Sequence, residues 1–498
     1  MPLDLALFER ADLLTLARTA TPSPKFKLLP AREPLPGEQY RFHFDMKKCI
    51  GCKCCVVACN EQNGNPADLN WRRVGELEGG VFPNVQRLHL SMGCNHCAEP
   101  ACMNGCPVKA YSKDSATGIV DHDPDMCIGC QYCTWNCSYG VPQFNEARGV
   151  VGKCDMCHGR LNQGHAPACV NACPEEAIEI EIVNIADWRA SHASANAPGM
   201  PSADDSLSTT RITMPANVPA DLARVDANRV APQHAHPSLV LLLVLTQMSL
   251  GAFACLWIAD LAGVALPNWS AIVPFLATAI AMAAAPAHLG RPMHAHRAWK
   301  GWKTSWLSRE VIGLGAFAGA AFAYGAAMFL DLPFRSLLGA GAVIAGTAGV
   351  LSSARIYMVK ARPAWDSVHT LVEFFLTALV LGPRLVLATR TADANWLLAL
   401  AAVATLAQIA NVVARSRRFQ SSSIFELNAS ANLASNEMGT LSKVRLALLA
   451  CALLSLPVPA ASLVLALAAE SAGRWLFFTT VVPKSMASTY LTPGGRAA

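Results

Sequence analysis

The stretch Cys49–Asn60, CIGCKCCVVACN, contains five cysteines in twelve residues and decides how the first part of the chain is interpreted. Four of them have the spacing C-x2-C-x2-C-x3-C: Cys49, Cys52, Cys55 and Cys59. The same spacing recurs in CIGCQYCTWNCS: Cys127, Cys130, Cys133 and Cys137. Cys54 falls outside the pattern, so we expect it to be a structural or incidental thiol.

Two further stretches vary this pattern by lengthening the middle gap. CNHCAEPACMNGCP widens the gap to four residues: Cys94, Cys97, Cys102 and Cys106. The pair CDMC and CVNACP widens it to eleven: Cys154, Cys157, Cys169 and Cys173. Of the 19 cysteines, 17 therefore lie between Cys49 and Cys173, while Cys255 and Cys451 stand in apolar stretches, where a small apolar role is the simplest expectation.

Sixteen cysteines in four sets of four predict four [4Fe-4S] clusters. In the bacterial ferredoxin pattern three closely spaced thiolates bind one cluster, and the fourth cysteine reaches another. Zinc sites also use C-x2-C pairs, but they do not need a further cysteine three residues after the third. Disulfides are disfavoured because the N-terminus lacks a continuous apolar secretory segment. This region has no phosphate-binding glycine loop, so we expect electron transfer and no catalytic residue in this chain.

The second half of the chain is far more apolar than the first and predicts a membrane anchor. Eight runs are long enough to cross a bilayer: 239–258, 271–288, 310–330, 337–358, 370–389, 396–414, 444–458 and 460–482. The predicted fold is an α+β ferredoxin-like four-cluster domain followed by an all-α eight-helix transmembrane bundle. The expected divisions are an N-terminal extension, the cluster domain, a linker or surface arm rich in Ala, Pro and Ser, the anchor and a C-terminal tail: 1–44, 45–190, 191–236, 237–487 and 488–498.

The distribution of Lys and Arg in the connections predicts the orientation of the anchor. Thirteen lie on the side that the cluster domain shares: Arg291, Arg297, Lys300, Lys303, Arg309, Arg355, Lys360, Arg362, Arg415, Arg417, Arg418, Lys443 and Arg445. The opposite side holds Arg335, Arg384 and Arg390. The cluster domain is therefore expected to face the cytoplasm from a bacterial inner membrane. The basic residues form no patch interleaved with aromatics, so nucleic acid is not an expected partner.

Ionisable side chains near the ends of spans are candidates for a quinone site, since a quinone needs hydrogen-bond donors and a proton route. The candidates are His288, Arg291, Glu310, Arg355 and Tyr357. The alternative is that such groups pair with one another or extend towards the membrane surface. For His288 we favour the functional interpretation, because imidazole can take up and release a proton near neutral pH. Pairing explains the deeper charges at least as well: Glu373, Arg384, Glu470 and Arg474.

Residues 45 to about 190 resemble the four-cluster electron-transfer subunit of the dimethyl sulfoxide reductase family of complex iron-sulfur molybdoenzymes. The stretches that carry the resemblance are SMGCNHCAEPACMNGCP, DMCIGCQYCTWNCSYGVPQFN and GKCDMCHGR. Residues from about 238 to 487 resemble the membrane anchor of that family, through HLGRPMHAHRAW, ARIYMVKARPAWDS and ESAGRWLFF. The chain is thus similar to two subunits fused.

The resemblance implies how the cysteines pair, which their spacing alone leaves open. It implies four sets: Cys49, Cys52 and Cys55 with Cys173; Cys154, Cys157 and Cys169 with Cys59; Cys94, Cys97 and Cys102 with Cys137; and Cys127, Cys130 and Cys133 with Cys106. It also implies a separate catalytic subunit carrying a molybdopterin cofactor near the first cluster, and a membrane quinone, menaquinone or ubiquinone, near the last. His288 is similar in place to a histidine implicated in the quinone site.

The substrate depends on the branch of the family. The cytoplasmic orientation, GELEGGVFPN and CNEQNGNPADLNWRRVGE look closest to cytoplasmic membrane-bound sulfite dehydrogenases. We therefore expect a sulfite:quinone system, in which this chain passes electrons to quinone. The alternatives are the reverse flow, from quinol to an S-oxide or N-oxide, a proton-translocating module of a larger respiratory complex, and a redox-sensing scaffold.

Overall fold

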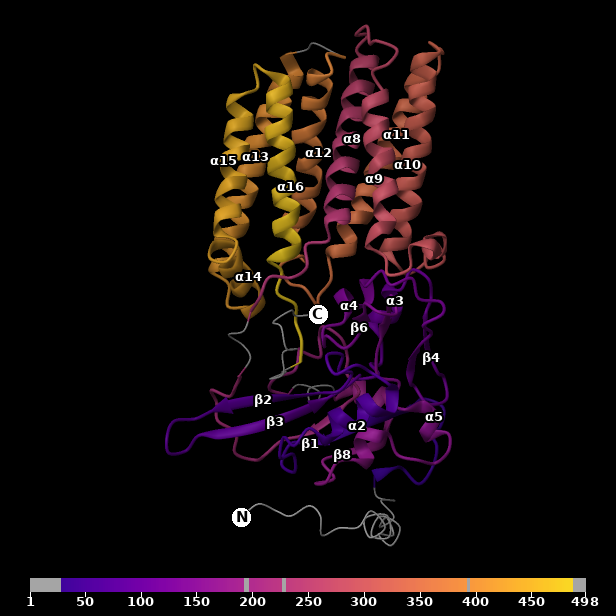
Figure 1. The fold of residues 1–498 in the computed structure, drawn as a ribbon, viewed down its shortest axis with the longest axis vertical. Helices are drawn as coiled ribbons and strands as arrows, with labels where there is room; N and C mark the ends of the chain where they lie inside the picture. The colour runs from indigo at the N-terminus through magenta and orange to yellow at the C-terminus, as the bar shows by residue number, and fades with distance from the viewer. Residues whose placement is uncertain (1–27, 192–196, 226–229, 392–394, 487–498) are drawn as a thin grey trace, which may run out of the picture.

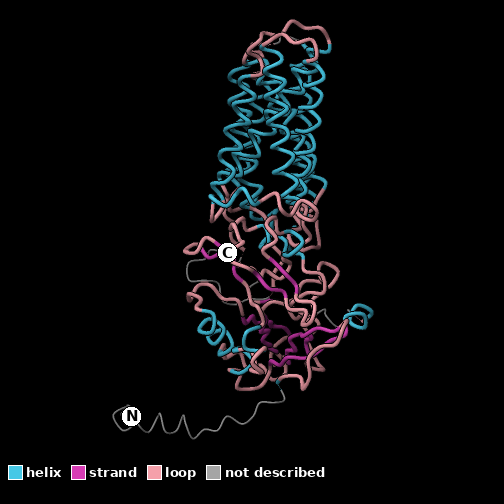
Figure 2. The backbone as a smooth tube through the Cα atoms, turned by 90° about the vertical axis from the view of Figure 1, so that its right-hand side faces the viewer, coloured by secondary structure: helices cyan, strands magenta, loops and turns pink. Residues whose placement is uncertain are grey.

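The computed structural model describes residues 28–191, 197–225, 230–391 and 395–486, and it has two parts. A mixed domain of short strands and helices lies at one end, and a bundle of long helices extends from it (Figure 1). The predicted C-terminal tail and most of the predicted N-terminal extension lie outside the described residues. In the view of Figure 2 the strands are confined to the mixed domain and the long helices to the other end.

The mixed domain is built on two three-stranded sheets. In the first, β1 (Glu38–Asp45) pairs antiparallel with β8 (Ile178–Asn184) and parallel with β9 (Arg211–Thr213). In the second, β2 (Arg73–Gly79) lies between β3 and β10. The remaining strands are β3 (Gln86–Met92), β4 (Tyr111–Lys113), β5 (Val120–His122), β6 (Gln143–Asn145), β7 (Val150–Gly152) and β10 (Ala223–Arg224). Thus β1 begins inside the predicted extension, and the predicted linker returns to the domain as β9 and β10.

Short helices lie between the strands of the mixed domain, and some of them carry cysteines of the four motifs. They are α2 (Cys54–Asn63), α3 (Ala101–Gly105), α4 (Tyr132–Asn136), α5 (His158–Leu161), α6 (Ala168–Asn171) and α7 (Ile185–Ala190). In all four motifs the third cysteine is the second residue of a helix: Cys55, Cys102, Cys133 and Cys169. The four motifs therefore share one local fold despite their different gaps.

Among the described residues, the bundle contains six helices that are long and apolar enough to cross a membrane: α8 (Pro237–Leu261), α10 (Trp306–Phe329), α11 (Arg335–Tyr357), α12 (Val368–Ala388), α13 (Asn395–Gln420) and α16 (Pro459–Thr479). The other two predicted spans correspond to shorter helices that run alongside them (Figure 1). These are α9 (Ile272–Ala284), which continues as a 3-10 turn to His288, and α15 (Gly439–Leu454). A further short helix, α14 (Phe425–Ser435), lies at the end of the bundle next to the mixed domain.

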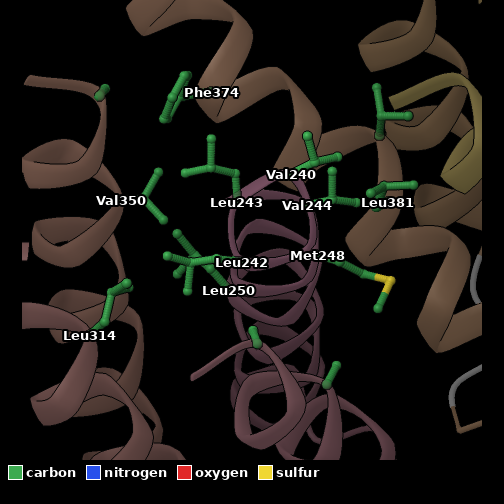
Figure 3. Packing of buried hydrophobic residues seen from close by; sticks show 14 of the residues in the cluster. Val240, Leu242, Leu243, Val244, Met248, Leu250, Leu314, Val350, Phe374 and Leu381 are labelled. Atoms are coloured by element: carbon green, nitrogen blue, oxygen red, sulfur yellow. The ribbon is translucent and has the colours of Figure 1, made fainter. Parts of the chain in front are cut away.

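Helix α8 is the centre of the bundle. Its most apolar stretch is 83% buried, against 33% for α10 and α13. Leu243 and Met248 extend from it towards opposite sides in Figure 3, among side chains of α10, α11 and α12. A Cβ at Gly251 would collide with the backbone of α12 near Gly382, so glycine is what lets these two helices approach so closely.

The bundle and the mixed domain are joined by backbone hydrogen bonds. The connection between α9 and α10 donates from Arg291 N to Ile128 O at 3.1 Å and from Gly301 N to Pro107 O at 2.7 Å. The carbonyls that accept belong to segments of the second and third cysteine motifs. A Cβ at Gly290 would overlap the backbone of Gly149, so the surfaces meet without intervening side chains.

Candidate metal centres and the membrane-face cavity

The thiols of the mixed domain gather into sets from distant segments. One cavity is lined by Cys49, Cys52, Cys55 and Cys173, which we call the distal set. A second is lined by Cys94, Cys97, Cys102 and Cys137. Each combines three cysteines of one motif with the last cysteine of another, as the family resemblance implies. Cys54 is exposed, and it does not line the cavity of the distal set.

The other eight cysteines also cluster. Burial, with smaller contributions from the neighbouring thiols of Cys169 and Cys157, raises the pKa of Cys59 to about 12. Burial also raises the pKa of Cys154, with Cys59 and Cys169 adding to the effect, so these four cysteines lie together. Burial likewise raises the pKa of Cys133, with Cys130, Cys106 and Cys127 adding to the effect. We call the last group the membrane-proximal set: Cys106, Cys127, Cys130 and Cys133.

A recurring backbone geometry shapes each site. The residue before the second cysteine has a positive φ in every motif: Gly51, His96, Gly129 and Met156. In this left-handed turn backbone N–H groups can point towards sulfur. Gly129 N donates to Cys127 Sγ at 3.4 Å, and Met156 N donates to Cys154 Sγ at the same distance.

The last cysteine of two motifs is held in a matching way. Ala110 N donates to Cys106 Sγ and Ala177 N to Cys173 Sγ, both at 3.3 Å. Four thiols per site with N–H donors to sulfur fit thiolate ligation of an iron-sulfur cluster, and free thiolates so deeply buried would be unfavourable. When bound, such clusters carry single electrons.

Two buried cations lie among the thiols, and the sequence motifs did not identify them. Arg72 is 2% exposed and donates to Ser91 O at 3.3 Å; burial lowers its pKa, but the thiolates of Cys169 and Cys55 more than offset this and raise it. Lys153 behaves in the same way beside Cys94 and donates to Cys154 O at 2.9 Å. In the sequence, the position of Lys153 directly before Cys154 could have indicated a cation beside the thiols.

A cavity of about 150 Å³ lies where the mixed domain meets the bundle, and we call it the membrane-face cavity. The mixed domain contributes Cys130 of the membrane-proximal set together with Trp135. The bundle contributes His288, Glu310 and Tyr357, from the end of α9, from α10 and from α11. The rest of the wall is largely apolar, including Leu239, Leu242, Met282, Leu307, Leu314 and Ile356.

The structure thus brings three of the five sequence-predicted quinone residues together. His288 Nδ1 donates to Ala285 O at 2.5 Å, which leaves Nε2 available to a ligand. Glu310 and Tyr357 are only 8% and 2% exposed, and within the described part of the chain Glu310 forms no ion pair.

The other two candidates are held outside the cavity. Arg291 donates to Pro124 O at 2.8 Å and so fastens the bundle to the mixed domain. Arg355 lies over the ring of Trp306 at 5.4 Å from its centroid. Both stand at the predicted membrane face, but sequence position alone did not show which way they turn.

In the sequence, Trp135 is notable only for its position between two cysteine ligands. In the structure it also contacts the bundle. It is 6% exposed and inserts into the end of the bundle. Its ring centroid lies 5.7 Å from that of Tyr357, 5.4 Å from that of Trp365 and 5.6 Å from that of His236. Because Trp135 lies between Cys133 and Cys137, this aromatic contact ties a ligand helix directly to the anchor.

The deeper charges of the bundle are paired. Glu373 accepts from Arg415 at 2.5 Å and from Arg445 at 2.6 Å. Glu470 accepts from Gln408 at 3.0 Å and from Thr377 at 2.7 Å. Arg384 donates to Ser462 at 2.9 Å, and Arg474 to Gln247 at 2.8 Å. These contacts support the structural interpretation for this group.

Comparison with known proteins agrees with the two-part architecture. Residues 85–182 match the family described as 4Fe-4S dicluster domain, and residues 233–480 match the family described as DMSO reductase anchor subunit. One of the chains of the anaerobic dimethyl sulfoxide reductase of Haemophilus influenzae is 40% identical over 151 residues, which are 28% of this protein and 73% of that relative. The present chain belongs to the dimethyl sulfoxide reductase family. It joins the iron-sulfur subunit and the membrane anchor of that family in one polypeptide.

Other relatives match this chain over a similar length. The corresponding chain of the anaerobic dimethyl sulfoxide reductase of Escherichia coli is 41% identical over 149 residues, 28% of this protein and 72% of that relative. One subunit of the sulfite dehydrogenase of Allochromatium vinosum is 36% identical over 154 residues, 27% of this protein and 64% of that relative. As a subunit of this family, the chain is an iron-sulfur electron-transfer component of a multi-pass membrane oxidoreductase complex with a catalytic partner subunit.

Proposed function

We propose that this chain carries electrons through four [4Fe-4S] clusters from a molybdopterin-containing catalytic subunit to membrane quinone, and that the catalytic subunit oxidises sulfite. Oxidation of sulfite with water to sulfate releases two electrons and two protons, and reduction of quinone to quinol consumes two of each. The proposal includes α9 and α15 as further membrane crossings, which makes eight and returns the chain to the side of the cluster domain.

The membrane-face cavity is the observation that carries the quinone assignment. To its wall the mixed domain contributes Cys130, which we assign to the last cluster, and the bundle contributes His288 and Glu310. An aromatic head group between them would lie beside the electron donor and the proton donors at once. The largely apolar wall suits a quinone ring.

The polar residues of the cavity have separable roles. The Tyr357 hydroxyl can donate a hydrogen bond to one quinone carbonyl. Because His288 Nδ1–H is used by Ala285 O, His288 Nε2 can donate to the other carbonyl when the imidazole is protonated, and the two bonds orient the ring. Glu310 lies on α10 without a counter-ion in the described residues, so its carboxyl can pass a proton to the ligand. Trp135 excludes water from the side of the cavity nearest the membrane-proximal set.

Two arguments favour sulfite. The thirteen basic residues of the connections on the cluster side, against three on the other, support a cytoplasmic cluster domain in the inner membrane. A subunit of a sulfite dehydrogenase is also among the relatives. The higher identity to chains of dimethyl sulfoxide reductases supports the alternative, in which quinol is oxidised and an S-oxide or N-oxide is reduced. A proton-translocating module is disfavoured because Glu373 and Glu470 are already held by basic or amide partners.

The test is to purify the native complex anaerobically through this chain and to assay metals and activity together. We expect stoichiometric molybdenum, about sixteen irons per copy of this chain plus any in the partner, and sulfite-dependent quinone reduction. Iron without molybdenum would contradict the molybdoenzyme assignment. Molybdenum with quinol-dependent S-oxide reduction and no sulfite activity would replace the substrate and reverse the direction.

A further inference from the structure

A second and larger cavity, of about 410 Å³, opens at the same end of the bundle as the membrane-face cavity. It lies between the end of α13, helix α14, the start of α15 and the end of α16, and we call it the basic cavity. Four cations line it: Arg415, Arg417, Lys443 and Arg445. No Asp or Glu is among the described residues that line it.

The four cations of the basic cavity are not equally neutralised. Arg415 and Arg445 both pair with Glu373, so one carboxylate is shared between two guanidinium groups. Arg417 and Lys443 are exposed, and in the described part of the chain neither forms an ion pair. The cavity therefore keeps an excess of positive charge even after Glu373 is counted.

A buried donor in the wall points to a missing acceptor. Arg445 is 2% exposed, and its Nε has no hydrogen-bond partner among the described residues. A guanidinium has five N–H donors, and a buried donor left unpaired is costly. An anionic oxygen entering the basic cavity could satisfy it.

Apart from several serines and Thr480, the rest of the wall is apolar, and it lies where the helices end. Val412, Leu446, Leu476 and Val481 line the basic cavity beside the cations. This arrangement of apolar wall and basic rim at one membrane face suits a molecule with an acyl chain and a phosphate. A small soluble anion would make no favourable contact with the apolar part of the wall.

We propose that the basic cavity binds the head group of an anionic phospholipid, from the leaflet next to the cluster domain. The phosphate would accept hydrogen bonds from Arg417, Lys443 and the free donors of Arg445. One acyl chain would lie along the apolar wall. The basic cavity and the membrane-face cavity have no lining residue in common. They are neighbours, since Tyr357 lines one, Trp365 lines the other, and the two ring centroids are 5.2 Å apart.

The test uses the full chain purified in mild detergent and titrated with phosphatidylglycerol, with binding counted by native mass spectrometry. We expect one tightly held phosphatidylglycerol, and a much weaker response to zwitterionic phosphatidylcholine. The double variant R417Q/K443Q should weaken phosphatidylglycerol binding by about thirtyfold, since each basic residue contributes about fivefold. Both side chains are exposed and form no ion pair in the described residues, so the variant should remain folded, which its thermal transition would check.

The matched control is R418Q, because Arg418 is an exposed neighbour on the same helix that does not line the basic cavity. It should leave the affinity within about twofold. Equal binding of the two lipids, or unchanged binding by the double variant, would overturn the proposal. So would displacement of the lipid by millimolar inorganic phosphate, which would indicate a soluble-anion site, or by a quinone, which would indicate a second quinone site.

Discussion

The membrane-face cavity and the basic cavity open at the same end of one bundle, yet their polar groups are arranged in opposite ways. In the membrane-face cavity Glu310 has no ion-pair partner in the described residues, and a cluster cysteine forms part of the wall. Beside the basic cavity the carboxylate of Glu373 is held by two arginines of the cavity wall, Arg415 and Arg445. The difference indicates that an ionisable residue in a span is informative about chemistry only when its partners are known.

Among variants that test this contrast, the one that removes Cys130 is expected to have the largest effect. C130S removes a thiolate of the membrane-proximal set and should reduce quinone turnover by more than the 10- to 100-fold typical of outer-shell changes, about a hundredfold or more. Iron content and the low-temperature electron paramagnetic resonance spectrum report the lost or altered cluster. C54S is the matched control, since Cys54 is a spare and exposed thiol, and it should retain all clusters. Full turnover in C130S would remove Cys130 from the electron path.

A second prediction concerns the unpaired acid. E310Q keeps the shape of the side chain yet cannot deliver a proton, so kcat for quinone should fall by about a hundredfold or more. The clusters should still be reduced by the catalytic subunit, which separates proton delivery from electron supply. E426Q, on α14, should have no effect on quinone turnover. A drop in cluster reduction in E310Q would instead indicate structural damage.

The paired acid should behave differently. E373Q leaves Arg415 and Arg445 without their shared carboxylate, and loss of one partner of a buried ion pair costs about 3–5 kcal/mol. Thermal or denaturant unfolding in detergent measures the loss, while the folded fraction should retain its quinone turnover. Turnover that falls as sharply as in E310Q, with stability unchanged, would favour a proton path through this half of the bundle.

The smallest expected effect is a pH dependence at the junction between the two halves. Burial lowers the pKa of His236 from 6.5 to about 3, and nearby His234, His288 and Arg362 contribute. The folded state thus binds the proton less well than the unfolded state. Stability should be complete well above pH 6.5 and fall, by about 2 kcal/mol near pH 5, as pH drops towards 3. H236Q should flatten this dependence in thermal unfolding between pH 7.5 and 5.

The cysteine motifs could be predicted from sequence because their geometry is local. A turn with positive φ and a helix that begins one residue before the third cysteine recur in each motif, so spacing carries most of the information. The role of the predicted linker could not be recognised, because β9 and β10 have only three and two residues and depend on pairing with β1 and β2.

The cavities were harder to predict because they are made of side chains from several helices and from the mixed domain. His288, Glu310 and Tyr357 were identified by chemistry, but so were Arg291 and Arg355, which turn towards Pro124 and Trp306. The partners of Glu373 come from α13 and α15, more than 40 residues away in sequence. Helix packing decides such contacts, and periodicity in one helix does not report it.

The central claim is that quinone binds beside Cys130 and away from the basic cavity. The most direct measurement is photo-crosslinking of the full chain with a photoactivatable quinone, followed by mass spectrometry of the labelled peptides. We expect label on residues 282–298, on the start of α10 or on Ile356 and Tyr357, suppressed by excess unlabelled quinone. Competable label on the residues of α13–α15 that line the basic cavity, with none in the membrane-face cavity, would contradict it.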